Sequence, residues 1–206
     1  MDPKIQAAFD SLQARMAREA ALYAELPRAE VERRIDEFML PIGPETGRLL
    51  NMLIKAAGCR SVLEIGTSVG YSTLWLGEAV RETGGRVVSL DANPAKHAEA
   101  RELLQEAGLG EVVELVTGDA LQSLARLEGP FDFVLLDVGR DLYIPCLEAF
   151  LPKLAAGGIV AADNMVSPAA TQAQAQAYQA RVRGIPALSS LLVPIGSGIE
   201  LSRRDR

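Results

Sequence analysis

The chain has 206 residues, 49% of them hydrophobic and 23% charged, which is typical of one soluble globular domain. The formal net charge is −6, and the only basic cluster is formed by Arg203, Arg204 and Arg206. Nucleic-acid binding needs a basic stripe, so this distribution of charge argues against a nucleic-acid partner. No apolar run is long enough to span a bilayer, so we expect no membrane association.

The cysteines and the first residues of the chain indicate the compartment. Cys59 and Cys146 are the only cysteines, and they lack the spacing of a CxxC motif. Two such thiols predict no disulfide framework, which favours a reducing compartment. The stretch MDPKIQAAFD has no basic segment followed by an apolar core, so it does not resemble a signal peptide. We therefore expect a cytoplasmic protein.

Three helices are predicted in the first part of the chain. Apolar residues at helical spacing mark the first one: Ile5, Ala8, Phe9, Leu12 and Met16. A second helix is expected over Ala29–Phe38, and a third from Pro44, a favourable first-turn residue, to Gly58. We expect a single domain, with residues 1–57 as a helical cap and residues 58–206 as an α/β core.

After the third helix, strands and helices alternate. The expected strands are Ser61–Ile65, Arg86–Leu90, Val112–Val116, Phe131–Leu136 and Gly158–Ala162. The expected helices are Tyr71–Arg81, Pro94–Ala107, Asp119–Leu127, Asp141–Leu154 and Pro168–Val182. Strands that are apolar throughout are typical of a parallel sheet buried on both faces. The pattern predicts a doubly wound, Rossmann-like α/β fold. Ser190–Ile195 and Ile199–Ser202, joined by residues 196–198, predict a C-terminal antiparallel hairpin.

The loop after the first strand, within VLEIGTSVGYS (residues 62–72), predicts a ligand site. Gly66 and Gly70 bracket a tight turn, and the helix that follows offers free N–H groups. A dinucleotide site would instead carry GxGxxG, which this loop lacks. The carboxylate of Glu64 beside the loop would repel a pyrophosphate and attract a sulfonium ion. The sequence therefore favours S-adenosylmethionine over NAD as the cofactor.

Acidic residues also follow the second and third strands. Asp91 ends the run VVSLD, where a carboxylate can accept hydrogen bonds from both ribose hydroxyls of a nucleoside. Asp119 and the backbone of Ala120 follow the third strand and are placed to meet an adenine edge. The alternative for Asp119 is a purely local one, since Asp is also a favourable helix N-cap.

Asp137 ends the fourth strand, and Asp163 with Asn164 ends the fifth. Adjacent parallel strands deliver their ends to one edge of the sheet, so two carboxylates and an amide oxygen should converge there. Such a set of oxygen ligands suits Mg²⁺ or Mn²⁺. The alternative is a turn, because Asp and Asn both tolerate left-handed backbone and bond their own main chain.

The sequence resembles the cation-dependent O-methyltransferases, the group that includes the catechol and caffeoyl-CoA enzymes and many bacterial relatives. The resemblance runs from about residue 40 to residue 202. Its motifs are GPETGRLLNMLIKA, VLEIGTSVGYSTLWL, SLDANPAKHAEARELLQEAGL, FDFVLLD, AADN and VPIGSGIELSRR.

This resemblance implies a class I methyltransferase fold, a homodimer and a small-molecule acceptor with two adjacent oxygens. It also implies which residues line the S-adenosylmethionine site: Ile42, Glu64, Gly66, Ser72, Asp91, Asp119, Ala120 and Asp137. The divalent cation would be held by Asp137, Asp163 and Asn164. We expect Glu64→Ala and Asp91→Ala to fold normally, because both carboxylates should line a cleft.

Arg140 departs from the family pattern. The family reads D-x-x-K after the fourth strand, and its lysine is regarded as the base that takes the acceptor's proton. Arginine stays protonated and cannot be that base, but it could stabilise an oxyanion, bind an acceptor carboxylate, or lie on the surface. His97 is expected to be a solvated helix residue facing away from the cleft. Tyr143 is a better candidate for acceptor contact, unless it lies in the core.

Three functions are compatible with these residues. The first is a metal-dependent O-methyltransferase that acts on a hydroxyl of a catechol-like or other small aromatic acceptor. The second is an S-adenosylmethionine enzyme with a carboxylated or nitrogen acceptor, bound by Arg140. The third is a cofactor-binding homologue that has lost catalysis. Retention of all three cation-ligand positions argues against the third.

Overall fold

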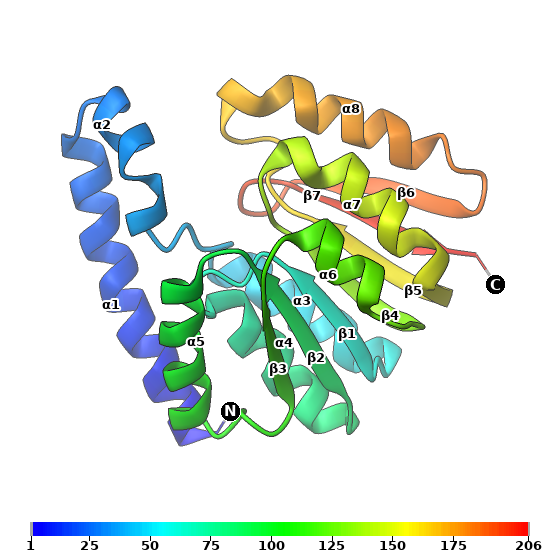
Figure 1. Cartoon of the computed structure of the whole chain (residues 1–206), viewed down its shortest axis with the longest axis horizontal. Helices are drawn as coiled ribbons and strands as arrows, with labels where there is room; N and C mark the ends of the chain where they lie inside the picture. The colour runs from blue at the N-terminus through cyan, green and yellow to red at the C-terminus, as the bar shows by residue number, and fades with distance from the viewer. Residues whose placement is uncertain (1, 206) are drawn as a thin grey trace.

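In a computed structural model that describes residues 2–205, a seven-stranded sheet runs through the molecule (Figure 1). The strands are β1 (Ser61–Ile65), β2 (Arg86–Asp91), β3 (Val113–Thr117), β4 (Phe131–Leu136), β5 (Leu154–Ala162), β6 (Leu188–Val193) and β7 (Ile199–Arg204). Their order is β3-β2-β1-β4-β5-β7-β6. The first five strands are parallel, and β7 is antiparallel to both β5 and β6. The predicted fold class is confirmed.

Helices cover both faces of the sheet. They are α1 (Pro3–Glu25), α2 (Arg28–Arg33), α3 (Pro44–Ala57), α4 (Tyr71–Thr83), α5 (Pro94–Glu106), α6 (Ala120–Arg126), α7 (Tyr143–Phe150) and α8 (Gln172–Arg183). Figure 1 shows α6, α7 and α8 grouped together, away from α1 and α5. Successive residues of a strand point to opposite faces of the sheet and belong to two separate hydrophobic cores. On β4, Phe133 and Leu135 pack with side chains of α1, α3 and α4. Val134 and Leu136 pack with side chains of α6, α7 and α8.

The strand order reverses at β1. This strand pairs with β2 on one side and with β4 on the other, so the connections leave it in opposite directions. The crevice beyond the carboxyl ends of the strands at such a switch point is where open α/β sheets bind ligands. The fold alone therefore places a ligand site between the ends of β1, β2 and β4.

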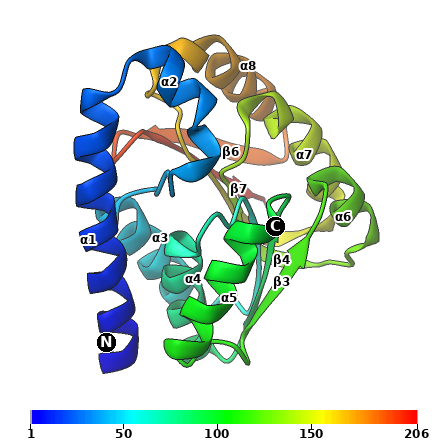
Figure 2. The same cartoon turned by 60° about the vertical axis from the view of Figure 1, so that its left-hand side comes forward.

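Helix α1 closes one side of the α/β core. Its buried face packs Phe9 against Trp75 and Tyr71 of α4, with ring centroids 4.3 and 5.8 Å apart. Figure 2 shows α1 running alongside the core and α2 turning back above it. Although α1 has 23 residues, no helix within residues 2–205 combines the length and apolar character needed to cross a membrane.

Three predicted helices differ from the observed ones. The segment expected to form one helix over 29–38 is divided into α2 and the 3₁₀ turn η1 (Ile35–Glu37). The helix expected over 168–182 begins as the 3₁₀ turn η4 (Ala169–Thr171) before α8. The helix expected over 141–154 ends earlier, in the 3₁₀ turn η3 (Leu151–Lys153), and Leu154 already belongs to β5, where it pairs with Phe131.

Gly66 allows β1 and β4 to approach each other at their carboxyl ends. Its φ of +108° is a conformation that side chains disfavour, and a Cβ added there would lie 1.8 Å from the carbonyl oxygen of Asp137. Asp137, the residue after β4, is held in place by a hydrogen bond of 2.9 Å from its N–H to the carbonyl of Ile65. The loop after β1 can therefore lie against Asp137 only if residue 66 is glycine.

We predict that Gly66→Ala destabilises the protein by clearly more than a strained backbone alone, which costs about 1–2 kcal/mol. Gly108→Ala is the matched control, because Gly108 has a φ of +70° but nothing within 4 Å of an added Cβ. Urea unfolding of both variants measures the difference. Equal losses of unfolding free energy would contradict the close approach at Gly66.

Candidate functional site

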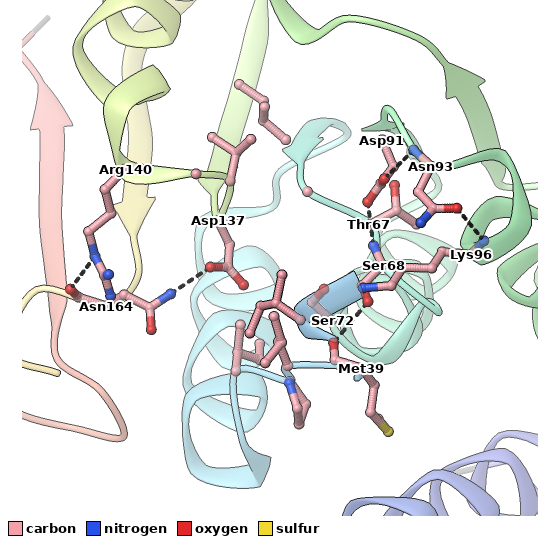
Figure 3. Close-up of a pocket in the computed structure, with 18 of the residues that line it drawn as sticks. Met39, Thr67, Ser68, Ser72, Asp91, Asn93, Lys96, Asp137, Arg140 and Asn164 are labelled. Atoms are coloured by element: carbon pink, nitrogen blue, oxygen red, sulfur yellow. Dashed lines mark hydrogen bonds between the residues drawn. The ribbon is translucent and has the colours of Figure 1, made fainter. Parts of the chain in front are cut away.

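A cavity of about 1140 Å³ opens at the carboxyl ends of the strands. Single-ligand pockets measure about 300–1,000 Å³, so this cavity has room for more than one small molecule. Nine candidate site residues named from the sequence line it: Ile42, Gly66, Ser72, Asp91, Asp119, Ala120, Asp137, Arg140 and Asn164. Glu64 and Asp163 do not line it. Figure 3 shows two polar groups on opposite sides of the cavity, one around Asp91 and the other around Asp137 and Asn164.

The carboxylate of Asp91 is fixed at the rim by two backbone donors. The N–H of Ser68 donates to Oδ2 at 2.7 Å, and the N–H of Asn93 donates to Oδ1 at 2.8 Å (Figure 3). The loop that carries Ser68 is itself held, because Gly66 and Thr67 both donate their N–H groups to the carbonyl of Leu90. Each carboxylate oxygen of Asp91 keeps capacity for a further hydrogen bond from a ligand hydroxyl.

The segment after η1 covers the same side of the cavity. The hydroxyl of Ser68 donates to the carbonyl of Met39 at 2.8 Å, and the ammonium group of Lys96 donates to the carbonyl of Phe38 at 2.8 Å. Ser68, Lys96 and Met39 line the cavity but were not identified from the sequence. Their placement depends on how the N-terminal helices dock, and local sequence spacing carries no signal of it.

Asp119 fits both interpretations drawn from the sequence, a ligand-site residue and a helix N-cap. It lines the cavity, and its Oδ1 also accepts a hydrogen bond from the N–H of Gln122 at 2.9 Å, which caps α6. Ala120, the first residue of α6, lines the cavity beside it.

Glu64 lies beneath the cavity, completely buried, and does not line it. Its Oε2 accepts hydrogen bonds from the hydroxyls of Thr73 at 2.6 Å and Ser89 at 2.5 Å, while Oε1 has no partner within residues 2–205. Burial raises the pKa of this carboxyl, and the hydroxyl donors oppose the rise. The expectation that Glu64 lines a cleft outside the core is therefore wrong.

His97 is also placed differently from the prediction. It is 1% exposed and not solvated. Its Nδ1 lies 2.7 Å from the hydroxyl of Thr117, and its Nε2 lies 2.8 Å from the hydroxyl of Thr67. Burial lowers the pKa of the imidazole. The ring therefore faces the loop after β1 from below, although the helical pattern of α5 suggested an outward face.

Asp137 and Asp163 lie together at the ends of β4 and β5, as predicted from their parallel pairing. Asp163 is 1% exposed, and its Oδ1 has no hydrogen-bond partner among the residues that the structure describes. Burial raises the pKa of Asp163 to about 6. Burial, followed by the charges of Asp163 and Glu64, raises the pKa of Asp137 well above its ordinary value. The pair is thus short of positive charge and of hydrogen-bond donors.

Asn164 completes this group. Its Nδ2 donates to Oδ1 of Asp137 at 2.7 Å (Figure 3). Rotation of the amide by half a turn would direct its oxygen to the same point. Its φ of +63° is left-handed, so the turn-forming property of Asn is used here as well.

The donor chemistry of this group fits a hard divalent cation. No group of three or more His, Cys, Asp or Glu side chains within residues 2–205 could hold a metal ion, and the predicted set is smaller, with two carboxylates and one amide. Mg²⁺ commonly takes one or two carboxylates and fills its remaining positions with water or substrate. The unpartnered Oδ1 of Asp163 is the atom that such an ion would satisfy.

Arg140 is bound to the loop that follows β5. Its Nε donates to the carbonyl of Asn164 at 3.1 Å, one terminal nitrogen donates to the carbonyl of Ser167 at 2.8 Å, and the other donates to the hydroxyl of Thr171. Its charge also opposes the rise in the pKa of Asp137. The guanidinium thus fixes the wall of the cavity that contains Asn164, a role that was not predicted.

Tyr143 belongs to the core. It is 1% exposed, packs edge-on against Tyr178, and donates its hydroxyl to the carbonyl of Asp163 at 3.2 Å. Burial raises the pKa of this hydroxyl well above its ordinary value. Of the two interpretations of Tyr143, the structure supports the core residue.

Comparison with known proteins identifies the family. The family model described as O-methyltransferase matches residues 13–205. A catechol O-methyltransferase of Mycobacterium tuberculosis is 37% identical over 145 residues, which cover 69% of this chain and 60% of that protein. The matched part of the chain therefore spans about three fifths of that relative's length.

Two solved structures share the whole fold. The cofactor-bound protein Rv0187 from MTB superposes with a TM-score of 0.79 at 29% identity, and the O-methyltransferase from Bacillus cereus in complex with SAH superposes with a TM-score of 0.78 at 27% identity. Each match covers 100% of this chain and 92% of the other. The chain belongs to the O-methyltransferase family, which confirms the resemblance drawn from its motifs.

Because Glu64 is buried and Asp91 is not, we predict that replacing Glu64 destabilises the protein more than replacing Asp91 does. Glu64→Ala leaves the hydroxyls of Thr73 and Ser89 without their acceptor and opens a cavity, which should cost about 2–4 kcal/mol of unfolding free energy. Asp91→Ala should cost less than half as much. Urea denaturation monitored by circular dichroism measures both. A Glu64→Ala protein as stable as the parent would contradict the buried placement.

Proposed function

We propose that the protein is an S-adenosylmethionine-dependent O-methyltransferase that uses a divalent cation to methylate a hydroxyl of a small aromatic acceptor. The observation that supports this most strongly is the composition of one cavity. The carboxylate of Asp91, fixed by two backbone N–H donors, lies on one side of it, and Asp137 and Asn164 lie on the other. Asp163, whose Oδ1 has no partner among the described residues, is buried beside Asp137 and does not itself line the cavity. The cavity volume allows a cofactor and an acceptor to bind together.

The cofactor half is formed by the ends of β1, β2 and β3. The fixed carboxylate of Asp91 is suited to accept hydrogen bonds from ribose hydroxyls. Asp119 and Ala120 are placed for an adenine edge, while Gly66 and Ser72 would lie along the methionine portion. The Bacillus cereus relative, whose complex contains SAH, supports this assignment.

The cation half is formed by the ends of β4 and β5. Asp137, Asp163 and Asn164 would hold Mg²⁺ or Mn²⁺, and the bound ion would lower the pKa of the acceptor hydroxyl. Arg140 keeps Asn164 in position through its bond to the Asn164 carbonyl. It does not act as a base, since a guanidinium stays protonated at ordinary pH.

The acceptor would lie between the cation half and the N-terminal helices. Apolar side chains face the cavity from that side: Tyr23, Leu26, Val31, Ile35, Leu40 and Pro41. Such walls suit an aromatic ring, and two adjacent oxygens on the ring would complete the ligands of the cation. Alignment of the two bound reactants supplies much of the rate, on the order of several kcal/mol in well-oriented systems.

The alternative acceptors receive less support. A carboxylated acceptor was attractive because Arg140, which lines the cavity, could bind it, but the loop after β5 already uses three of the five N–H donors of that guanidinium. A cofactor-binding homologue without catalysis would have no need of the buried carboxylate pair. The homodimer and the cytoplasmic location stay predictions from the family resemblance and from the sequence.

We predict that S-adenosylhomocysteine binds to the protein and that NAD does not. Asp91→Ala should weaken binding by about tenfold or more, because hydrogen bonds to a charged acceptor contribute about 1.5–3 kcal/mol each. Isothermal titration calorimetry measures the dissociation constant. Asp10→Ala, which removes a carboxylate on α1 outside the cavity, is the control and should bind as the parent does. Parental affinity in Asp91→Ala would count against this site.

We predict that methyl transfer from labelled S-adenosylmethionine to a vicinal aromatic diol requires Mg²⁺ or Mn²⁺. Asp163→Asn keeps the side-chain shape but removes a charge, and should lower turnover at least as much as loss of an outer-sphere partner, about 10- to 100-fold. Asp141→Asn, an exposed carboxylate on the 3₁₀ turn η2 (Arg140–Leu142), is the matched control. Activity that survives exhaustive chelation would refute the cation's role.

We predict that Arg140→Lys loosens the loop after β5 and does not create a more active enzyme. A lysine ammonium cannot replace three donors in a planar fork, so amide exchange over residues 164–171 should become faster. The acceptor KM should rise. Hydrogen exchange read by mass spectrometry detects the first effect, with Arg181→Lys, at an exposed position of α8, as the control. Unchanged exchange would show that the loop does not depend on Arg140.

A further inference from the structure

A continuous chain of buried hydrogen bonds lies beneath the cofactor half of the cavity. It runs from the Thr117 hydroxyl to His97, from His97 to the Thr67 hydroxyl, from Thr67 to Ser89, and from Ser89 to Glu64. Its four contacts measure 2.7, 2.8, 2.5 and 2.5 Å in that order. We name these five residues the buried hydroxyl chain. All but Thr117 are at most 1% exposed.

When Glu64 is ionised and accepts from Ser89, the number of protons sets the direction of the other three bonds. A hydroxyl has a single hydrogen to donate. Ser89 donates its hydrogen to Oε2 of Glu64, so it must accept from Thr67. Thr67 has then used its hydrogen and must accept from Nε2–H of His97. The neutral imidazole carries its only N–H at Nε2, and its Nδ1 accepts from Thr117.

The buried hydroxyl chain connects the ends of three strands. Glu64 belongs to β1, Ser89 to β2 and Thr117 to β3, and His97 on α5 joins the last of these to the loop after β1. That loop carries Thr67 and, next to it, Ser68, whose N–H holds Oδ2 of Asp91. The side chain of Thr67 therefore anchors from below the loop that fixes Asp91 above.

We infer that His97 is a positioning residue for the cofactor. Its Nε2–H holds Thr67, and through Thr67 it keeps Ser68 and Asp91 in the geometry that a nucleoside requires. His97 does not line the cavity and would not touch the cofactor. This inference rests on the proposed binding of S-adenosylmethionine.

The tautomer of His97 gives the first test, and it uses the unaltered protein. His97 is the only histidine in the chain, so its ring nitrogens give a single set of signals in a long-range ¹H–¹⁵N correlation spectrum. We expect a protonated Nε2 and a bare Nδ1 at neutral pH. We also expect these signals to move as S-adenosylhomocysteine is added and to saturate with the calorimetric dissociation constant. An Nδ1–H tautomer, or signals indifferent to the ligand, would overturn the inference.

Two amide substitutions of similar size separate positioning from simple packing. In His97→Gln the side-chain amide can reach the position of Nε2 and donate to Thr67, whereas in His97→Asn the shorter amide reaches only the position of Nδ1. We expect His97→Gln to bind S-adenosylhomocysteine within about threefold of the parent, and His97→Asn to bind about five- to tenfold more weakly, as for one lost hydrogen bond. The effect should fall on the cofactor KM, with kcat nearly unchanged.

Thr67→Val breaks the same link from the other side and should weaken binding as His97→Asn does. Circular dichroism at the titration temperature establishes that each variant is folded.

If folded His97→Asn and Thr67→Val bind as the parent does, or if His97→Gln binds as weakly as His97→Asn, the positioning role of His97 is refuted while the proposed function stands. If the parent itself does not bind S-adenosylhomocysteine, the proposed function fails and the positioning role fails with it. Should a variant not fold, the tautomer and the ligand response of the parent decide the matter.

Discussion

The close approach of the carboxyl groups of Asp137 and Asp163 is the constraint on which the cation half of the cavity depends. Parallel pairing of β4 with β5 brings the two groups together. Asp163 is buried, whereas Asp137 is half-buried where it lines the cavity. Burial raises the pKa of both groups, and the charge of Asp163 raises the pKa of Asp137 further. A charged pair of this kind is stable only if positive charge or hydrogen-bond donors compensate it. Arg140 and the amide of Asn164 supply part of that compensation. A divalent cation would supply the remainder.

The two halves of the cavity achieve their geometry in different ways. On the cofactor side, neutral hydroxyls and backbone N–H groups fix the loop after β1 and the carboxylate of Asp91. On the cation side, the charge of Arg140 fixes the loop after β5. Gly66 lies where the two halves meet, because it lets the loop after β1 rest against the carbonyl of Asp137. The cofactor would therefore bind against the loop after β1, and the acceptor against the loop after β5. The distance between the two would be set by the sheet.

Much of this arrangement follows from local sequence. Apolar strands alternating with helices predict the parallel sheet, and a parallel sheet brings its carboxyl ends to one edge, so Asp91, Asp137 and Asn164 could be assigned to the cavity. The burial of Glu64 could not be predicted in this way. Helices cover both faces of the sheet, so the sequence does not show on which face of β1 its side chain lies or which helix packs over it. The position of His97 was predicted wrongly because the face of α5 that packs on the sheet depends on tertiary packing. The contacts of Arg140 depend on the path of residues 164–171, and the sequence of this segment has no helical or strand periodicity from which that path could be predicted. The early end of α7, at Phe150, reflects pairing of Leu154 with Phe131, a tertiary contact.

The central claim is that Asp137, Asp163 and Asn164 hold a divalent cation beside the bound cofactor. Crystals grown with Mn²⁺ and S-adenosylhomocysteine, measured near the manganese absorption edge, test it most directly. The account predicts one strong anomalous peak between the two carboxylates and the Asn164 amide oxygen, with the ribose hydroxyls on Asp91. Bound S-adenosylhomocysteine with no manganese at this position, and Arg140 moved in to neutralise the carboxylates, would contradict it.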